Sequence, residues 1–261
     1  MTPPRQTQPP PGAEAKALVS FYDEAYTQDP AEAQRYSRWR ALGAIGKADH
    51  VMALCARAGI VPAGTLEVGC GDGALLCELH TRGFGGRLAG VEITEAAVQI
   101  AARRSEIDSV ALYDGSRLDQ PDGAYELGIL SHVLEHVPDP AALLREVARV
   151  CSAVVVEVPL EANLSARRAS KREHAEGVGH LQRLDRGAAR SIAAAAGLSV
   201  VAELEDPLPP AVHCFFAHSA AARARATAKW GLRTTLHRLA PAPARRLFTV
   251  HYACLCLPHS R

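Results

Sequence analysis

The segment TLEVGCGDGALLCEL, residues 65–79, combines a glycine-rich turn with an acidic side chain. Gly69, Gly71 and Gly73 follow a strand-like run and precede a helix-like one. Glycine accepts a positive φ and carries no Cβ, so the backbone N–H groups of such a turn can approach a ligand closely. Ligands of open α/β sheets bind beyond the carboxyl ends of the strands, and we therefore expect a cofactor at this turn.

The turn by itself fits two cofactor classes. Gly69-x-Gly71-x-x-Ala74 satisfies the dinucleotide fingerprint, and Glu92 follows Gly71 by 21 residues, at the end of the next predicted strand. A carboxylate at that place accepts hydrogen bonds from ribose hydroxyls. Both NAD and S-adenosylmethionine contain a ribose, so these residues leave both cofactors open.

Three further features favour S-adenosylmethionine. Glu67 lies two residues before Gly69, where a dinucleotide turn normally has an apolar residue, and its carboxylate suits a ligand with an ammonium and a sulfonium group. Asp114 and Gly115 follow the third predicted strand, where a side-chain acceptor and a backbone N–H can read an adenine edge. The fourth predicted strand ends in ILSHVLEHVPDP, residues 129–140.

Four motifs in this order resemble the class I S-adenosylmethionine-dependent methyltransferases, in the small-molecule branch that includes ubiquinone-biosynthetic enzymes. They are LEVGCGDG, GVEIT, YDGS and LSHVLEHVPDP, and the resemblance is strong over about residues 64–160. It implies an α/β fold with a Rossmann-like, doubly wound seven-stranded sheet, mostly parallel with an antiparallel last strand. The alternation of strands and helices independently predicts a doubly wound, mostly parallel sheet.

The resemblance also implies a role for each matching residue. Glu67, Gly69, Gly71 and Gly73 would surround the methionine part of the cofactor, and Glu92 would hold the ribose hydroxyls. Residues on the adenine and sulfonium sides follow from the same motifs: Ile93 packing on the adenine, Asp114 and Gly115 at its edge, and Ser131 and His132 near the sulfonium.

The chain divides into three predicted regions. Residues 1–12 form a Pro-rich disordered tail, residues 13–60 form N-terminal helices that act as a lid, and residues 61–261 form the methyltransferase domain. We expect the lid helices to break near Gly43 or Gly46. Inserts at 161–184 and 207–247 are expected to shape the acceptor site. Predicted helix N-caps are Asp29, Thr94, Asp139 and Asp185.

Histidine is the natural candidate for a catalytic base, which methyl transfer needs only when the acceptor must lose a proton. His132 and His180 are the two candidates, with His180 open between a role beside the acceptor and one in anchoring its loop. We interpret His136 as a structural, hydrogen-bonded residue. His251 is a weaker candidate, because the alternation of its strand can explain it.

Composition limits the partners and the compartment. The formal net charge of +1 gives no global attraction to nucleic acid or anionic membranes, and no apolar run approaches the ~20 residues of a membrane span. The N-terminus lacks the apolar region of a secretory signal, so we expect a cytoplasmic protein, monomeric or homodimeric. Seven scattered cysteines show no paired CxxC, and no metal site is expected.

These features together predict an S-adenosylmethionine-dependent methyltransferase of a small metabolite, with O-methylation in specialised metabolism as the leading hypothesis. The basic segment 163–177 is either a solvated helix or a surface that captures an anionic acceptor, and residues 220–247 pose the same choice. Alternatives are N- or C-methylation of a small anionic metabolite, an RNA or protein methyltransferase, an NAD(P)-dependent oxidoreductase, and a non-catalytic cofactor-binding partner.

Overall fold

The computed structural model describes residue 26 and residues 30–259. The predicted tail at 1–12, residues 13–25 of the predicted N-terminal helices and the predicted cap Asp29 lie outside the described residues. Within the described residues, seven strands form one sheet in the order β3-β2-β1-β4-β5-β7-β6. The strands are β1 (Gly64–Val68), β2 (Arg87–Glu92), β3 (Ser109–Leu112), β4 (Tyr125–Ser131), β5 (Cys151–Pro159), β6 (Leu198–Asp206) and β7 (His251–Pro258).

Strands β1 to β5 are parallel to one another, whereas β7 runs antiparallel to both β5 and β6. The predicted fold class, including the antiparallel last strand, is confirmed. Since β7 lies between β5 and β6 and runs the opposite way, the beginning of β7 meets the ends of both strands. His251 pairs with Pro159 at the end of β5 and with Asp206 at the end of β6.

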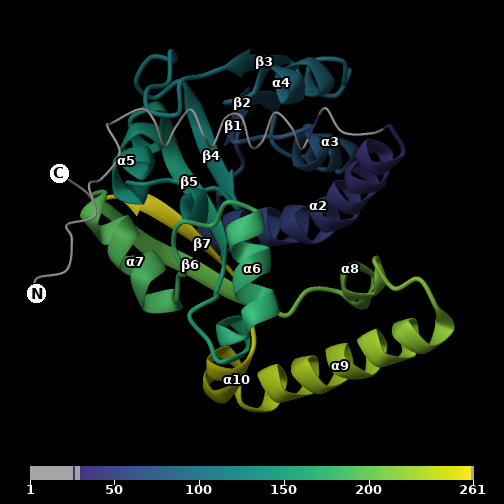
Figure 1. Ribbon diagram of the computed structural model, residues 1–261. Helices are drawn as coiled ribbons and strands as arrows, with labels where there is room; N and C mark the ends of the chain where they lie inside the picture. The colour runs from purple at the N-terminus through teal and green to yellow at the C-terminus, as the bar shows by residue number, and fades with distance from the viewer. Residues whose placement is uncertain (1–25, 27–29, 260–261) are drawn as a thin grey trace, which may run out of the picture.

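Helices cover both faces of the sheet (Figure 1). On one face α5 and α7 pack through Leu144, Val147 and Ala193, and on the other α2 and α3 pack through Leu54 and Leu79. Strand β5 is buried throughout except at its second residue, as its run of β-branched residues predicts. The helices of these layers are α2 (Pro30–Ala58), α3 (Ala74–Thr81), α4 (Glu95–Ala101), α5 (Pro140–Val150) and α7 (Arg186–Ala195).

Helix α2 is continuous, so the predicted break at Gly43 or Gly46 is wrong. Each of these glycines weakens a helix by about 1 kcal/mol relative to alanine. The helix nevertheless buries a stripe of apolar side chains against the sheet, and each large one contributes about 1.5–3 kcal/mol. Packing therefore outweighs the local preference; the stripe consists of Ala44, Ala48, Val51, Leu54 and Cys55.

Helix caps follow the sequence where an aspartate is present. Asp139 accepts a hydrogen bond from the Ala142 N–H at 2.9 Å, and Asp185 accepts one from the Ala188 N–H at 2.7 Å. Thr94 precedes α4 as predicted, but its hydroxyl makes no capping hydrogen bond. The predicted starts of these helices are therefore right, while only the two aspartates cap through their side chains.

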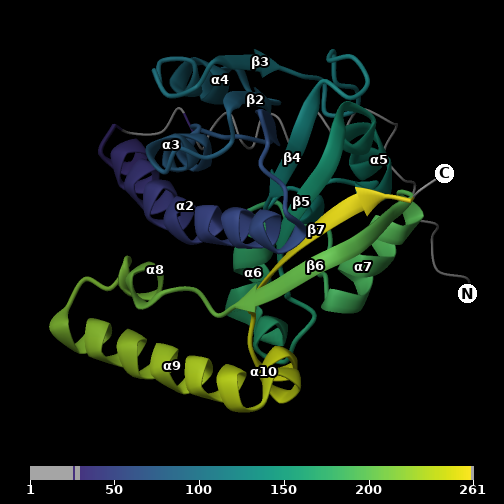
Figure 2. The ribbon, with the colours of Figure 1, turned by 180° about the vertical axis from the view of Figure 1, so that it is seen from behind.

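The remaining helices gather beyond the end of the sheet where the parallel strands finish (Figures 1 and 2). They come from the two stretches that the sequence predicts as inserts at 161–184 and 207–247. No helix in the described part of the chain is both long enough and apolar enough to cross a membrane. The helices and short 3-10 turns of this region are η2 (Ser165–Arg167), α6 (Ala169–Gly177), α8 (Pro210–Cys214), α9 (Ala220–Leu239) and α10 (Pro241–Leu247).

Candidate active site

The turn after β1 adopts the conformation that its glycines predict. Gly69, Gly71 and Gly73 have φ values of 75°, 55° and 76°. A Cβ on Gly71 would lie 2.7 Å from the hydroxyl oxygen of Tyr26, and one on Gly73 would lie 2.4 Å from Cδ1 of Ile107. Conformation and space both require glycine here, and the N–H groups of Gly69, Cys70 and Gly73 donate to backbone carbonyls, which fixes the turn.

Two acidic side chains flank this turn. Glu67 is buried, and its Oε2 has no hydrogen-bond partner among the described residues. Burial raises the pKa of Glu67 to about 8, although Lys47 acts in the opposite direction. Glu92 at the end of β2 accepts hydrogen bonds from the N–H of Gly71 at 3.0 Å and of Ile93 at 2.6 Å. Glu92 is thus fixed by backbone, whereas Glu67 has an oxygen available for a cationic ligand.

The loop after β3 presents Asp114 in a fixed, ionised form. Its Oδ1 accepts hydrogen bonds from the backbone N–H groups of Ser116 at 2.7 Å and Arg117 at 2.8 Å. These bonds lower the pKa of Asp114. Gly115 has a φ of 83°, so this position also favours glycine.

One cavity of about 1250 Å³ joins these residues. The turn, the ends of β2 and β4, the β3 loop, helix α2 and both inserts contribute to its walls. Gly73 is the one predicted cofactor residue that does not line it, because it lies behind the turn at the start of α3. The other predicted site residues all border the cavity: Glu67, Gly69, Gly71, Glu92, Ile93, Asp114, Gly115, Ser131, His132 and His180.

The end of β4 carries two polar side chains into this cavity. Ser131 is buried, and its hydroxyl has no partner among the described residues. His132 has a φ of 59°, which is uncommon for a residue other than glycine. Its Nδ1 lies 3.2 Å from Oε1 of Glu135, and its Nε2 lies 3.0 Å from Nδ1 of His251.

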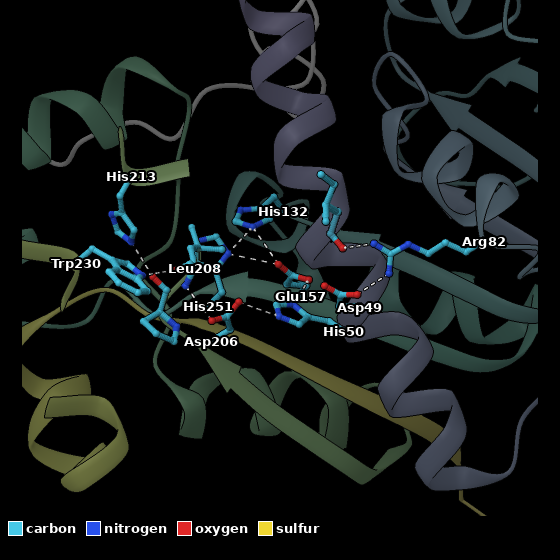
Figure 3. A network of polar contacts seen from close by, with 12 residues as sticks. Asp49, His50, Arg82, His132, Glu157, Asp206, Leu208, His213, Trp230 and His251 are labelled. Carbon is cyan, nitrogen blue, oxygen red and sulfur yellow. Dashed lines mark hydrogen bonds and ion pairs between the residues drawn. The ribbon is translucent and has the colours of Figure 1, made fainter. Parts of the chain in front are cut away.

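A buried acid, Glu157, lies at the centre of a histidine cluster that the sequence analysis missed (Figure 3). Its Oε1 lies 3.4 Å from Nδ1 of His251 and 3.6 Å from Nε2 of His132, and its Oε2 lies 3.1 Å from Nδ1 of His50. Burial opposes ionisation, but hydrogen bonds from the three histidines hold the pKa of Glu157 well below its usual range. One signal was available: a single acid in the apolar run AVVVEVPL.

His50 connects this cluster to the end of β6. Its Nε2 lies 3.2 Å from Oδ2 of Asp206. Burial lowers the pKa of His50, yet the hydrogen bonds to Asp206 and Glu157 outweigh it and raise the pKa to about 9. At neutral pH the cation on His50 therefore balances part of the negative charge of the two carboxylates.

His180 and His136 form a separate pair at the cavity wall. The Nδ1 of His180 lies 2.7 Å from Oε2 of Glu161, and its ring centre is 4.7 Å from that of His136. The Nδ1 of His136 is 3.0 Å from the carbonyl oxygen of Gly179, and burial lowers the pKa of His136. His180 is thus held by its loop and also borders the cavity, so both predicted roles stay open.

Four of the cations that border the cavity from the two inserts form what we call the basic cluster. They are Arg168, Lys171, Lys229 and Arg233. Burial lowers the pKa of Lys229, and the charges of Arg233, Lys171 and Arg168 lower it further. No ion pair with a carboxylate joins the four in the described residues. Positive charge without local compensation favours an anionic ligand at this end of the cavity.

Helix α2 closes the cavity on the turn side. Trp39, Arg40 and Lys47 line it. Arg40 donates from Nε to Oδ2 of Asp72 at 2.9 Å, and its guanidinium lies 4.8 Å above the ring of Tyr26. Arg40 is therefore fixed beside the glycine turn.

Comparison with known proteins finds matches to methyltransferases. A family model described as a methyltransferase domain matches residues 36–203. A ubiquinone biosynthesis O-methyltransferase from Pseudomonas paraeruginosa is 30% identical over 100 residues, which are 36% of this chain and 42% of that protein. An ajmaline N-methyltransferase from Rauvolfia serpentina is 33% identical over 97 residues, 35% of this chain and 33% of that protein. The chain thus spans less than half the length of these relatives.

Among solved structures, this chain is similar in fold to geranyl diphosphate C-methyltransferase from Streptomyces coelicolor A3(2). The TM-score is 0.64 at 12% identity, and the match covers 96% of this chain and 100% of that one. That structure holds Mg²⁺, geranyl diphosphate and S-adenosyl-L-homocysteine. At this identity the likeness shows the fold alone.

Proposed function

Because the chain belongs to the methyltransferase-domain family, we propose that it transfers a methyl group from S-adenosylmethionine to a hydroxyl group of a small anionic metabolite, in specialised metabolism. Family membership confirms the predicted resemblance to the class I S-adenosylmethionine-dependent methyltransferases. The observation that carries the proposal is the buried Oε2 of Glu67, which has no partner among the described residues and lies beside a glycine turn that lines the cavity.

The residues present fit this cofactor. An ammonium group placed at Oε2 of Glu67 would supply the partner that this oxygen lacks among the described residues. A dinucleotide would instead bring a pyrophosphate to the turn and would offer no cation to the buried Oε2 of Glu67. Glu92 and Asp114 would hold the ribose hydroxyls and the adenine edge, and Ile93 would pack on the adenine.

When bound, S-adenosylmethionine supplies a methyl carbon already activated for displacement. The chain's contribution is to orient the acceptor on the axis of that carbon and to exclude water. His132 lines the cavity, with Nδ1 3.2 Å from Oε1 of Glu135 and Nε2 3.0 Å from Nδ1 of His251, and is our candidate for the group that accepts or holds a proton from an acceptor hydroxyl. His180, which lines the cavity from the same insert as Arg168 and Lys171, is a second candidate.

The basic cluster supports an anionic acceptor. Its four cations line the same cavity as the glycine turn and His132, so a negatively charged tail could bind to them while the reacting group points to His132. The same cluster also supports a second candidate function, N- or C-methylation of an anionic metabolite, since the structural relative described above binds a diphosphate.

The test is methyl transfer from methyl-labelled S-adenosylmethionine to a panel of small acceptors. Each hydroxylated acid or phosphate ester is paired with its uncharged analogue and with its deoxy analogue. We expect labelled product from anionic, hydroxylated members, and less product after Lys229→Gln. Labelled product from amines or alkenes that lack a hydroxyl group would instead indicate N- or C-methylation. Methyl transfer to the uncharged analogues at the same rate as to the anionic acceptors would contradict the proposal of an anionic acceptor.

A further inference from the structure

Three donor atoms from three strands converge at the end of the sheet. Nε2 of His132 lies 3.0 Å from Nδ1 of His251, which lies 3.4 Å from Oε1 of Glu157, and the third side of this triangle is 3.6 Å. Ligands of a tetrahedral ion with bonds of about 2.0–2.1 Å are separated by about 3.3 Å. We propose that His132, Glu157 and His251 hold one divalent transition-metal ion.

The outer contacts of these residues suit ligation. Nδ1 of His132 faces Oε1 of Glu135 at 3.2 Å, and Oε2 of Glu157 faces Nδ1 of His50 at 3.1 Å. Such contacts fix the tautomer and orientation of metal ligands. They occupy the atoms of His132 and Glu157 that point away from the triangle and leave Nε2 and Oε1 directed into it.

The fold places the three ligands together without a cysteine motif. Ser131, the residue before His132, is paired with Glu157 across β4 and β5, and His251 begins β7 where β5 ends. His132 takes a left-handed backbone conformation, which is uncommon for a residue other than glycine and is found more often at functional sites. The expectation of no metal came from cysteine spacing, which carries no information about this group.

The cavity leaves room for a further ligand. The side chains of His132 and His251 are 25% and 15% exposed and line the cavity, whereas Glu157 is 2% exposed behind them. Two imidazoles and one carboxylate favour Zn²⁺, Fe²⁺ or Co²⁺ over Mg²⁺. If the proposed function holds, the open position takes the acceptor hydroxyl, and coordination lowers the pKa of that hydroxyl. His132 then acts as a ligand rather than as the base.

A second group of possible ligands, Glu135, His136 and His180, provides the matched control. It is looser, since Nε2 of His136 is 4.0 Å from Oε1 of Glu135. Nδ1 of His180 is already paired with Glu161 at 2.7 Å. Substitution of His180 therefore removes a cavity histidine and leaves the proposed triangle intact.

The experiment is a Co²⁺ titration of the full chain after dialysis against a chelator. We expect one equivalent to bind, with the visible absorption of four-coordinate Co²⁺, and Zn²⁺ to displace it. His251→Ala and Glu157→Gln should weaken Co²⁺ binding at least tenfold, and His180→Ala should bind as the wild type does. Circular dichroism establishes that each variant is folded.

The wild-type titration decides the outcome even if a variant fails to fold. Absence of stoichiometric uptake would overturn the proposal and leave the three residues as a hydrogen-bonded cluster. Equal loss of binding in His180→Ala would also overturn it, because the ion would then belong to another site. Metal uptake does not depend on cofactor binding, so failure of S-adenosylmethionine to bind would refute the proposed function and leave this result standing.

Discussion

The change Glu67→Gln tests whether a buried, unpartnered carboxyl lies beside the glycine turn. The native pKa of about 8 compares with an ordinary value of 4.5. Each pH unit between them corresponds to about 1.4 kcal/mol, so ionising Glu67 costs the native state on the order of 5 kcal/mol. Because the native pKa is raised, the favourable contribution is complete below pH 4.5 and is lost as pH rises through 8.

The assay is urea unfolding of wild type and Glu67→Gln at pH 5, 7 and 9. Glutamine stays neutral, so the free energy of unfolding of the wild type should fall relative to the variant as pH rises. We expect the gap to widen by several kcal/mol between pH 5 and pH 9. The exposed Glu95→Gln on α4 is the control and should follow the wild type. Parallel pH profiles for wild type and Glu67→Gln would refute the reasoning.

The same variant links Glu67 to the cofactor. An ammonium group near the carboxylate favours its ionised form, so S-adenosylhomocysteine should displace a proton from Glu67 on binding at pH 7. Calorimetry in two buffers of different ionisation enthalpy measures this release. The ligand's own amino group contributes equally in both proteins, and the difference between wild type and Glu67→Gln is therefore the readout. Equal proton release in both would place the ammonium elsewhere.

Three more predictions address the turn, the basic cluster and a helix cap. Gly71→Ala should weaken S-adenosylhomocysteine binding at least tenfold, whereas Gly83→Ala, with a φ of 63° but open space, should cost about 1 kcal/mol of stability and no affinity. If calorimetry gave the two variants similar affinities for S-adenosylhomocysteine, the crowding of a Cβ at position 71 would not affect the cofactor site. Inorganic pyrophosphate should raise the melting temperature of the wild type and of the control Arg225→Gln, which lies one turn from Lys229 on α9. It should raise the melting temperature of Lys229→Gln much less. An equal rise in all three proteins would contradict binding of the anion at the basic cluster. Asp185→Ala should lower the free energy of unfolding by about 1 kcal/mol in urea, and no change would mean that the cap is dispensable.

The fold, and the convergence of the proposed cofactor residues on one cavity, were predictable because their signals are local. The glycines after β1, the acid ending β2 and the Asp-Gly after β3 each lie at the carboxyl end of a parallel strand. Such ends meet at one edge of a sheet, so residues that follow different strands in the sequence can be predicted to lie in one site. The structure brings these residues to one cavity, apart from Gly73.

The histidine cluster was not predictable in the same way. Glu157 and His251 are separated by 94 residues, and only the antiparallel insertion of β7 between β5 and β6 brings them together. The alternation of apolar and polar residues explained His251 as an ordinary strand residue, and Glu157 lay within a run of apolar residues that predicted only a buried strand. The break predicted in α2 failed for a related reason: glycine propensity is local, whereas the burial of Val51 and Leu54 against the sheet is not.

Calorimetric titration with S-adenosylhomocysteine tests the central claim most directly. We expect the wild type and Glu95→Ala to bind one equivalent, Glu92→Ala to bind at least tenfold more weakly, and NADH to show no binding. Tight binding of NADH, or an affinity for S-adenosylhomocysteine that is unchanged in Glu92→Ala, would contradict the assignment of the cavity to S-adenosylmethionine.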